Sequence, residues 1–157
     1  MKLRHRETGE SHEAIIDLLL EEDWKVIEKS DSFSFNWKQE KKRTVNKIRL
    51  KNESEIQGLV SYEDIPKEFR IHLHLIENSQ QNKGKLKKYD FIAGCLIART
   101  CEIAFEKNYN GFVSLEPKTE LVFLYKNKYG FEEMGNYLFT ELSNSERLIK
   151  EYLTYEK

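Results

Sequence analysis

The chain has 157 residues, the length of about one ordinary domain with a buried core. Its 27 acidic and 26 basic residues give a formal net charge of −1, so it lacks the basic excess typical of a dedicated nucleic-acid-binding domain. Hydrophobic residues make up 39 % and aromatic residues 12 %, too large a share for a disordered chain. We therefore expect a single domain over residues 1–157 and no nucleic-acid partner, although a local basic patch is compatible with this balance.

No apolar run approaches the roughly 20 residues that a membrane span needs. The longest, Ala14–Leu20, is interrupted by Asp17, and Met1–Glu10 is charged, without the apolar core of a signal peptide. Cys95 and Cys101 lie six residues apart in a helical pattern and so face different directions, which predicts neither a disulfide nor a zinc site. These features predict a cytoplasmic protein without a membrane partner.

The first half of the chain is expected to contain one clear helix and then a run of strands. Ser11 suits a helix N-cap, and apolar residues follow at helical spacing, so a helix is predicted over residues 12–22. Residues 24–28 are expected to form a short helix or strand. Alternating apolar residues and turn signals then predict four strands: Ser32–Lys38, Val45–Lys51, Ile56–Glu63 and Phe69–Ile76.

The second half is expected to alternate helices and strands after a long polar loop, Asn78–Asp90. Apolar residues at three-and-four spacing predict the strongest helix from about Ala93 to Phe105. The elements expected after it are a strand (Phe112–Glu116), a helix (Thr119–Tyr129) with Gly130 at its C′ position, a hairpin around Gly135 (Phe131–Leu142), and a last helix opened by a Ser143–Glu146 capping box. This order of elements predicts an α/β arrangement.

The junction between the long loop and the strongest helix is a candidate phosphate-binding segment. The start of a helix offers free backbone N–H groups and the positive end of the helix dipole. Lys87 and Lys88 add positive charge, and the small residues Ala93 and Gly94 allow close approach to the backbone. An ordinary solvated lysine-rich loop before a core helix is the alternative interpretation.

Four further side chains are candidates for catalysis. Tyr125, if it faces a cleft, can donate a proton to a leaving group; otherwise it is a core tyrosine. His72 and His74 project from one face of their strand, but no third ligand has a recognisable spacing, so no metal is predicted. One histidine could act as a base; otherwise both are ordinary polar residues on a half-open sheet face. Glu77, at the end of the strand, could likewise be a base or an ordinary solvated side chain. No serine or cysteine nucleophile motif and no dinucleotide-binding glycine pattern are present.

Three segments together resemble the GNAT superfamily of acetyl-CoA-dependent N-acetyltransferases, and in particular a small bacterial subgroup of it. Strand Phe69–Ile76, the loop and Ile92–Ala98 resemble the family's pyrophosphate-binding motif, with Lys88, Phe91 and Ala93 on its defining places. Gly111–Leu115 resembles the next strand, and Leu124–Phe131 resembles the family signature in which Leu-Tyr is followed, a few residues later, by Gly-Phe. The resemblance covers about residues 45–142 and implies a mixed, mostly antiparallel central sheet flanked by helices.

The resemblance also implies residue roles. Acetyl-CoA would be the cosubstrate, and an unidentified primary amine would attack its thioester directly. Tyr125 matches the tyrosine that protonates the departing thiolate, with Glu77 as the first choice of general base and His74 as the second. Backbone groups of Leu75, Ile76 and Glu77 would bind the pantetheine arm. The implied pyrophosphate cradle consists of the backbone of Lys88, Tyr89, Asp90, Phe91, Ile92, Ala93 and Gly94.

Two side chains depart from the family pattern. Phe91 stands where the motif usually has glycine, and Lys118 stands where many relatives have an asparagine that contacts the cofactor arm. Both departures bear on cofactor affinity, so a GNAT-fold protein that binds CoA or a partner without catalysis is the alternative to an acetyltransferase. No pattern in the sequence encodes the oligomeric state, and a dimer is compatible with it.

Overall fold

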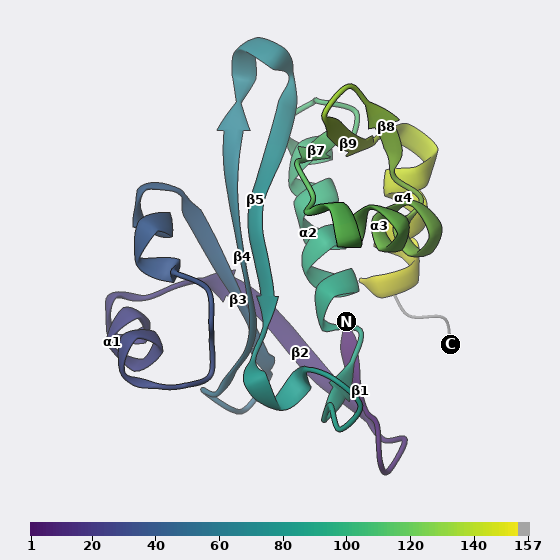
Figure 1. Ribbon diagram of the computed structural model, residues 1–157. Helices are drawn as coiled ribbons and strands as arrows, with labels where there is room; N and C mark the ends of the chain where they lie inside the picture. Colours follow the sequence, from purple (N-terminus) through teal and green to yellow (C-terminus); the bar gives the residue numbers. More distant parts are fainter. Residues whose placement is uncertain (154–157) are drawn as a thin grey trace.

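A nine-stranded sheet is the central element of the structure, a computed structural model that describes residues 1–153 (Figure 1). Its order is β6-β1-β2-β3-β4-β5-β7-β9-β8, and among the described pairs only β5 and β7 are parallel. The mixed, mostly antiparallel sheet confirms the expected fold class. The strands are β1 (Lys2–His5), β2 (Ser11–Leu18), β3 (Thr44–Leu50), β4 (Ile56–Ile65), β5 (Arg70–Asn78), β6 (Tyr89–Asp90), β7 (Val113–Leu115), β8 (Glu132–Met134) and β9 (Tyr137–Thr140).

Helices cover both faces of the sheet. On one face α2 (Ile92–Glu106) packs against β4, β5 and α4 (Leu142–Tyr152), with α3 (Val122–Tyr129) beside it; α1 (Glu21–Lys29) lies on the other side of β3 and β4 (Figure 1). The main core lies under α2, and a smaller core that includes Ile27, Trp37 and Leu59 lies under α1. Within residues 1–153, no helix has the length and apolar character needed to cross a membrane.

Residues 11–18 form strand β2, so the predicted helix over residues 12–22 is wrong. The first part of β2, Ser11–Glu13, pairs with β1 and the rest, Ala14–Leu18, pairs with β3, and the β-branched Ile15 and Ile16 suit a strand. The helix begins later, at Glu21, where the carboxylate of Asp23 accepts the N–H of Leu20 at 2.8 Å. Residues 24–28, for which helix and strand were both open, lie inside α1.

The strand predicted over Ser32–Lys38 is also wrong, because this segment is a loop that leads into a 3₁₀ turn, Trp37–Lys42. The backbone N–H groups of Ser34 and Phe35 donate to the carboxylate of Glu77 on β5 rather than to a neighbouring strand. The alternation of aromatic residues suggested hydrogen bonds to a neighbouring strand, but one buried carboxylate accepts these N–H groups instead.

Helix α4 begins at Leu142, with Glu141 as its N-cap and no side-chain cap, so the predicted Ser143–Glu146 capping box is wrong. The N–H of Leu142 donates to the carbonyl of Asn110 at 2.8 Å, and Ser145 Oγ donates to the carbonyl of Gly111 at 2.7 Å. These bonds to the turn before β7 fix the start of the helix and place Ser143 in its first turn.

The remaining predicted elements are confirmed, with small shifts of their bounds. β3, β4, β5, α2, β7 and the β8–β9 hairpin lie where the sequence places them. The helix predicted over Thr119–Tyr129 is a 3₁₀ turn, Thr119–Leu121, followed by α3, and Gly130 ends α3 with a φ of 71°, a left-handed conformation that glycine adopts readily. The long loop contains a 3₁₀ turn, Gln80–Asn82, and ends in β6, which pairs with β1.

Candidate functional site: a cleft between two diverging strands

A cleft opens where β5 and β7 separate. Their parallel pairing ends at Leu73 and Leu115, while β5 continues to Asn78 with only β4 beside it among the described strands. Two adjoining cavities of about 340 and 240 Å³ occupy this gap. The residues that line both are Phe35, Ile76, Leu121 and Tyr125, so we treat them as one cleft. One backbone edge of β5 therefore faces a cavity instead of another strand.

His74 reaches this cleft through an irregularity in β5. Leu73 and Leu75 pair with the consecutive β4 residues Tyr62 and Ser61, so His74 is the extra residue of a β-bulge, a feature that re-aims side chains. His74 lines the cleft, and its Nε2 lies 2.9 Å from Oε1 of Glu63. The hydrogen bond with His74 lowers the pKa of Glu63, so this carboxylate stays ionised and orients the imidazole.

His72 lies beside His74, with ring centroids 4.7 Å apart. Its Nδ1 is 2.8 Å from Ser114 Oγ and 3.0 Å from Arg70 Nη1. Burial, helped by the nearby His74 and Arg70, lowers the pKa of His72 from 6.5 to about 4, so His72 is neutral at pH 7. Within residues 1–153, no three His, Cys, Asp or Glu side chains are placed to hold a metal ion.

The shifted pKa of His72 makes stability depend on pH. Between pH 6.5 and about 4 the unfolded chain binds a proton at His72 that the native protein does not bind. The neutral His72 therefore contributes to the free energy of unfolding above pH 6.5, and this contribution is lost as the pH falls. We expect the native protein to lose about 3 kcal/mol more unfolding free energy than a His72→Gln variant between pH 7 and pH 4. Urea unfolding curves across this range measure the difference, and parallel pH profiles would contradict the assignment.

Tyr125 is fixed in the wall of the cleft by aromatic neighbours. It is 6 % exposed and lines both cavities. The rings of Tyr129 and Phe131 lie at centroid distances of 6.0 and 5.5 Å and hold it in place. Burial raises the pKa of Tyr125 to about 12, so its hydroxyl is protonated at neutral pH and can donate a hydrogen bond to a charge that develops in the cleft.

Glu77 is buried and fully occupied as an acceptor. Its carboxylate accepts the Ser34 N–H and hydroxyl at 2.8 Å each and the Phe35 N–H at 3.1 Å. Trp37 Nε1 donates at 2.8 Å and Lys83 Nζ at 2.5 Å. Burial alone would raise the pKa of Glu77, but the hydrogen bonds outweigh it and hold the pKa below its usual range. This arrangement suits a structural anchor, and it favours His74 over Glu77 as proton acceptor.

Two backbone N–H groups of the predicted phosphate-binding segment already donate hydrogen bonds within the protein. The N–H of Lys88 donates to the carbonyl of Gln81, and the N–H of Tyr89 donates to Asn82 Oδ1, each at 2.9 Å. Tyr89 and Asp90 form strand β6. The free N–H groups belong to the first turn of α2, Ile92–Gly94, before the first helical bond from Cys95 to Phe91. Ala93 in this turn lines the cleft, so the cradle reaches the cleft at its C-terminal end.

Phe91, at the place where the family motif usually has glycine, has a left-handed backbone conformation that glycine adopts readily. Its φ of 82° is left-handed, which costs a residue with a Cβ roughly 1–2 kcal/mol. Its ring lies under the Arg4 guanidinium at 5.0 Å and beside the Tyr152 ring at 6.3 Å. The Phe91 side chain is therefore held at the start of α2 by contacts with β1 and α4.

Lys118 lines the cleft, together with two residues that no sequence motif indicated, Phe35 and Lys83. The ring of Phe35 lies between two ammonium groups, with Lys83 Nζ at 5.6 Å and Lys118 Nζ at 5.2 Å from its centroid. Lys88, which the motif points to, does not line the cleft, and its ammonium lies 5.6 Å from the Tyr89 ring. The lysines at the cleft are thus Lys83, which is ion-paired with Glu77, and Lys118; the carboxylates of Glu116 and Glu120 also line the cleft.

Comparisons with known proteins find similarity in the fold but not in the sequence. No protein-family model matches the chain. No curated protein gives a significant sequence match. Among solved structures, nourseothricin acetyltransferase superposes with a TM-score of 0.59 at 12 % identity, covering 82 % of this chain and 98 % of that one.

Two further structures are similar. One is AtaT complexed with acetyl-methionyl-tRNAfMet, with a TM-score of 0.54 at 14 % identity, covering 87 % of this chain and 99 % of that one. The other is an N-acetyltransferase from Staphylococcus aureus Mu50, with a TM-score of 0.54 at 15 % identity, covering 83 % and 99 %. The sheet order, the parting of β5 and β7 and these superpositions together show that the chain has a GNAT-like fold.

Proposed function

We propose that this protein is an acetyl-CoA-dependent N-acetyltransferase that transfers an acetyl group to a primary amine by direct attack. The observation that carries the proposal is the cleft, which joins a free β-strand edge, the first turn of a helix and a buried tyrosine. Structures with the same fold support it, since they include acetyltransferases and the AtaTR complex bound with acetyl-CoA.

The cosubstrate would lie along the cleft. Leu75 and Ile76 on the free edge of β5 would bind the amide groups of the pantetheine arm, as a neighbouring strand would. The N–H groups of Ile92, Ala93 and Gly94 would bind the pyrophosphate at the start of α2. Lys118 would supply balancing positive charge, since the Lys83 ammonium is already ion-paired with Glu77.

An ammonium acceptor loses two protons in the reaction and the departing sulfur gains one; the site has a base for the first loss and a donor for the sulfur. An ammonium acceptor must lose a proton to become a nucleophile; His74, oriented by Glu63, takes it. As the carbon–nitrogen bond forms and the carbon–sulfur bond breaks, the sulfur becomes negative and the amine releases a second proton. The Tyr125 hydroxyl donates a hydrogen bond to that sulfur, which takes up one proton as the thiol forms, so one proton is released overall.

Release of free CoA thiol from acetyl-CoA in the presence of a panel of primary amines tests this proposal. We expect thiol release that depends on both the amine and the enzyme, with the acetylated amine detected by mass spectrometry. Hydrolysis of acetyl-CoA without an acetylated product, or no thiol release with any amine, would contradict transfer to an amine.

Replacing Phe91 with glycine is expected to strengthen acetyl-CoA binding. The change removes a strained left-handed residue and a side chain beside the first turn of α2. We expect the Kd measured by calorimetry to fall several-fold, alongside a thermal stability that is equal or higher. Phe69→Gly is a matched control, because Phe69 also has a positive φ, of 51°, but lies between a 3₁₀ turn and β5 instead of at the start of α2. An unchanged Kd in Phe91→Gly would show that Phe91 does not limit access to these N–H groups.

A further inference from the structure

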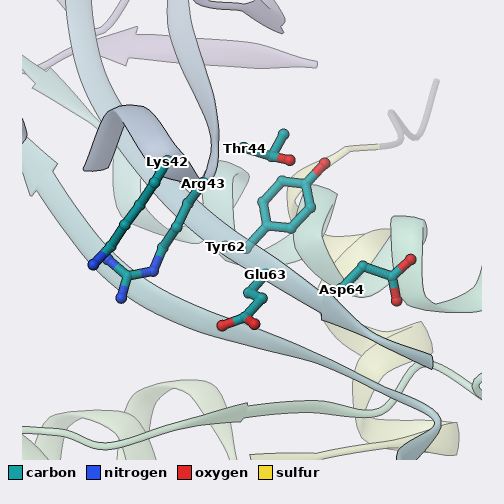
Figure 2. A pocket seen from close by; sticks show the side chains of 6 residues that line it. All are labelled: Lys42, Arg43, Thr44, Tyr62, Glu63 and Asp64. Carbon is teal, nitrogen blue, oxygen red and sulfur yellow. The ribbon is translucent and has the colours of Figure 1, made fainter. Parts of the chain in front are cut away.

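A second, polar cavity of about 540 Å³ adjoins the Glu63–His74 pair (Figure 2). It exists because β3 begins at Thr44, opposite Tyr62, whereas β4 continues to Ile65. Beyond Tyr62, β4 therefore has β5 as its only strand neighbour in the described part of the chain. The residues that line this cavity, which we call the polar pocket, are Lys42, Arg43, Thr44, Tyr62, Glu63 and Asp64.

The polar pocket is lined by two cationic side chains, and within residues 1–153 an ion pair is found for only one of them, Arg43. The Lys42 ammonium makes no hydrogen bond or ion pair within residues 1–153. Arg43 uses one nitrogen, Nη1, to bind both oxygens of Glu40 at 3.0 Å, which leaves its other guanidinium N–H groups available. Figure 2 shows the nitrogen ends of Lys42 and Arg43 on the same side of β4 as the carboxylate of Glu63.

The two carboxylates of the pocket differ in what they contact. Asp64 accepts the Tyr109 hydroxyl at 2.7 Å and pairs with Lys107 at 3.2 Å, so its charge is compensated. Glu63 is half exposed and contacts His74. The pocket thus places one negative group, Glu63, next to the proposed base, with the nitrogen ends of Lys42 and Arg43 on the same side of the strand.

We propose that the acceptor is an amine that carries a separate anionic group, such as a carboxylate. Its ammonium pairs with Glu63 beside His74, and its anionic group binds Lys42 and the free N–H groups of Arg43 in the polar pocket. This assignment rests on the proposed acetyl transfer and names its substrate class. His74 lines the cleft, and its partner Glu63 lines the polar pocket, so one acceptor can bind in the pocket and present its nitrogen to the cleft.

Linear ω-amino acids of two to six carbons, each compared with its own amide, test the assignment by thiol release. The amide keeps the amine and the chain length but lacks the negative charge. We expect the best acid to exceed its amide at least about tenfold in kcat/KM, which corresponds to roughly 1.4 kcal/mol. Lys42→Ala should remove most of that preference. Lys38→Ala is the matched control, because Lys38 is an exposed lysine of the same 3₁₀ turn that does not line the pocket.

A second measurement needs no turnover. The N-acetylated acid and its amide are titrated into ¹⁵N-labelled protein, and the amide signals of Thr44 and Glu63 are followed. We expect shifts with the acid that are lost in Lys42→Ala, and none with the amide. Equal kcat/KM for acid and amide, or no shift with the acid, overturns the substrate class. Thiol release with uncharged amines would then leave the proposed function standing, whereas failure to bind acetyl-CoA would remove the proposed function itself.

Discussion

Tyr125→Phe is expected to lower kcat about 100-fold and to leave the Kd for acetyl-CoA within about twofold. The substitution removes one hydroxyl and keeps the ring that packs against Tyr129 and Phe131, so the fold and the cleft are preserved. Loss of one group that donates to a leaving atom typically costs two to four orders of magnitude in rate. Steady-state thiol release and acetyl-CoA calorimetry on the same preparation separate the two effects.

The matched control for this experiment is Tyr137→Phe, which removes a hydroxyl from a tyrosine that lines neither cavity of the cleft. An unchanged kcat in Tyr125→Phe, at low and high pH alike, would exclude Tyr125 as the group that assists the departing sulfur. Normal acetyl-CoA binding together with no transfer by the native protein would instead support a CoA-binding module without catalysis.

Glu77→Ala is expected to lower the free energy of unfolding by about 3 kcal/mol. The Phe35 N–H, the Ser34 N–H and the buried Trp37 indole would lose their acceptor at once, and Lys83 would lose its ion pair. The segment that brings Phe35 to the cleft would be released from β5. Urea unfolding measures the loss. Glu55→Ala is the control, because Glu55 is exposed and its side chain accepts one hydrogen bond, from Gln81.

Glu77→Gln separates the structural role from catalysis. The amide oxygen still accepts hydrogen bonds, so we expect the fold to be kept and kcat to stay within about tenfold of the native value, with His74 as base. A kcat that falls by more than 100-fold in a folded Glu77→Gln protein would restore Glu77 as the general base.

Local sequence patterns predict an element correctly where residues close together in the chain determine its structure. The three-and-four spacing of α2, the alternation of β5 and the left-handed Gly130 all lie where the sequence places them. β2 shows the opposite case: its apolar residues suit either a helix or a strand, and the pairing with β1 and β3 decides. That information lies in segments far away in the sequence.

The candidate site was predictable in the parts that a motif carries, such as Tyr125 and the start of α2. Phe35 and Lys83 were missed because Glu77 brings them to the cleft, and a single buried acceptor with five donors leaves no periodic signal in the sequence. The polar pocket was missed for a similar reason, since it depends on where β3 begins relative to β4. Long-range hydrogen bonds and strand ends therefore decide the part of the site that is specific to this chain.

Titration of acetyl-CoA into the ¹⁵N-labelled protein tests the central claim most directly. We expect one binding site with a Kd between roughly 1 µM and 1 mM, the range of typical substrate affinities. The amide signals that shift should be those of Leu75 and Ile76 on β5 and of Ala93 and Gly94 in α2. No shift at millimolar acetyl-CoA, or shifts confined to other parts of the chain, would contradict the proposal that this cleft binds the cosubstrate.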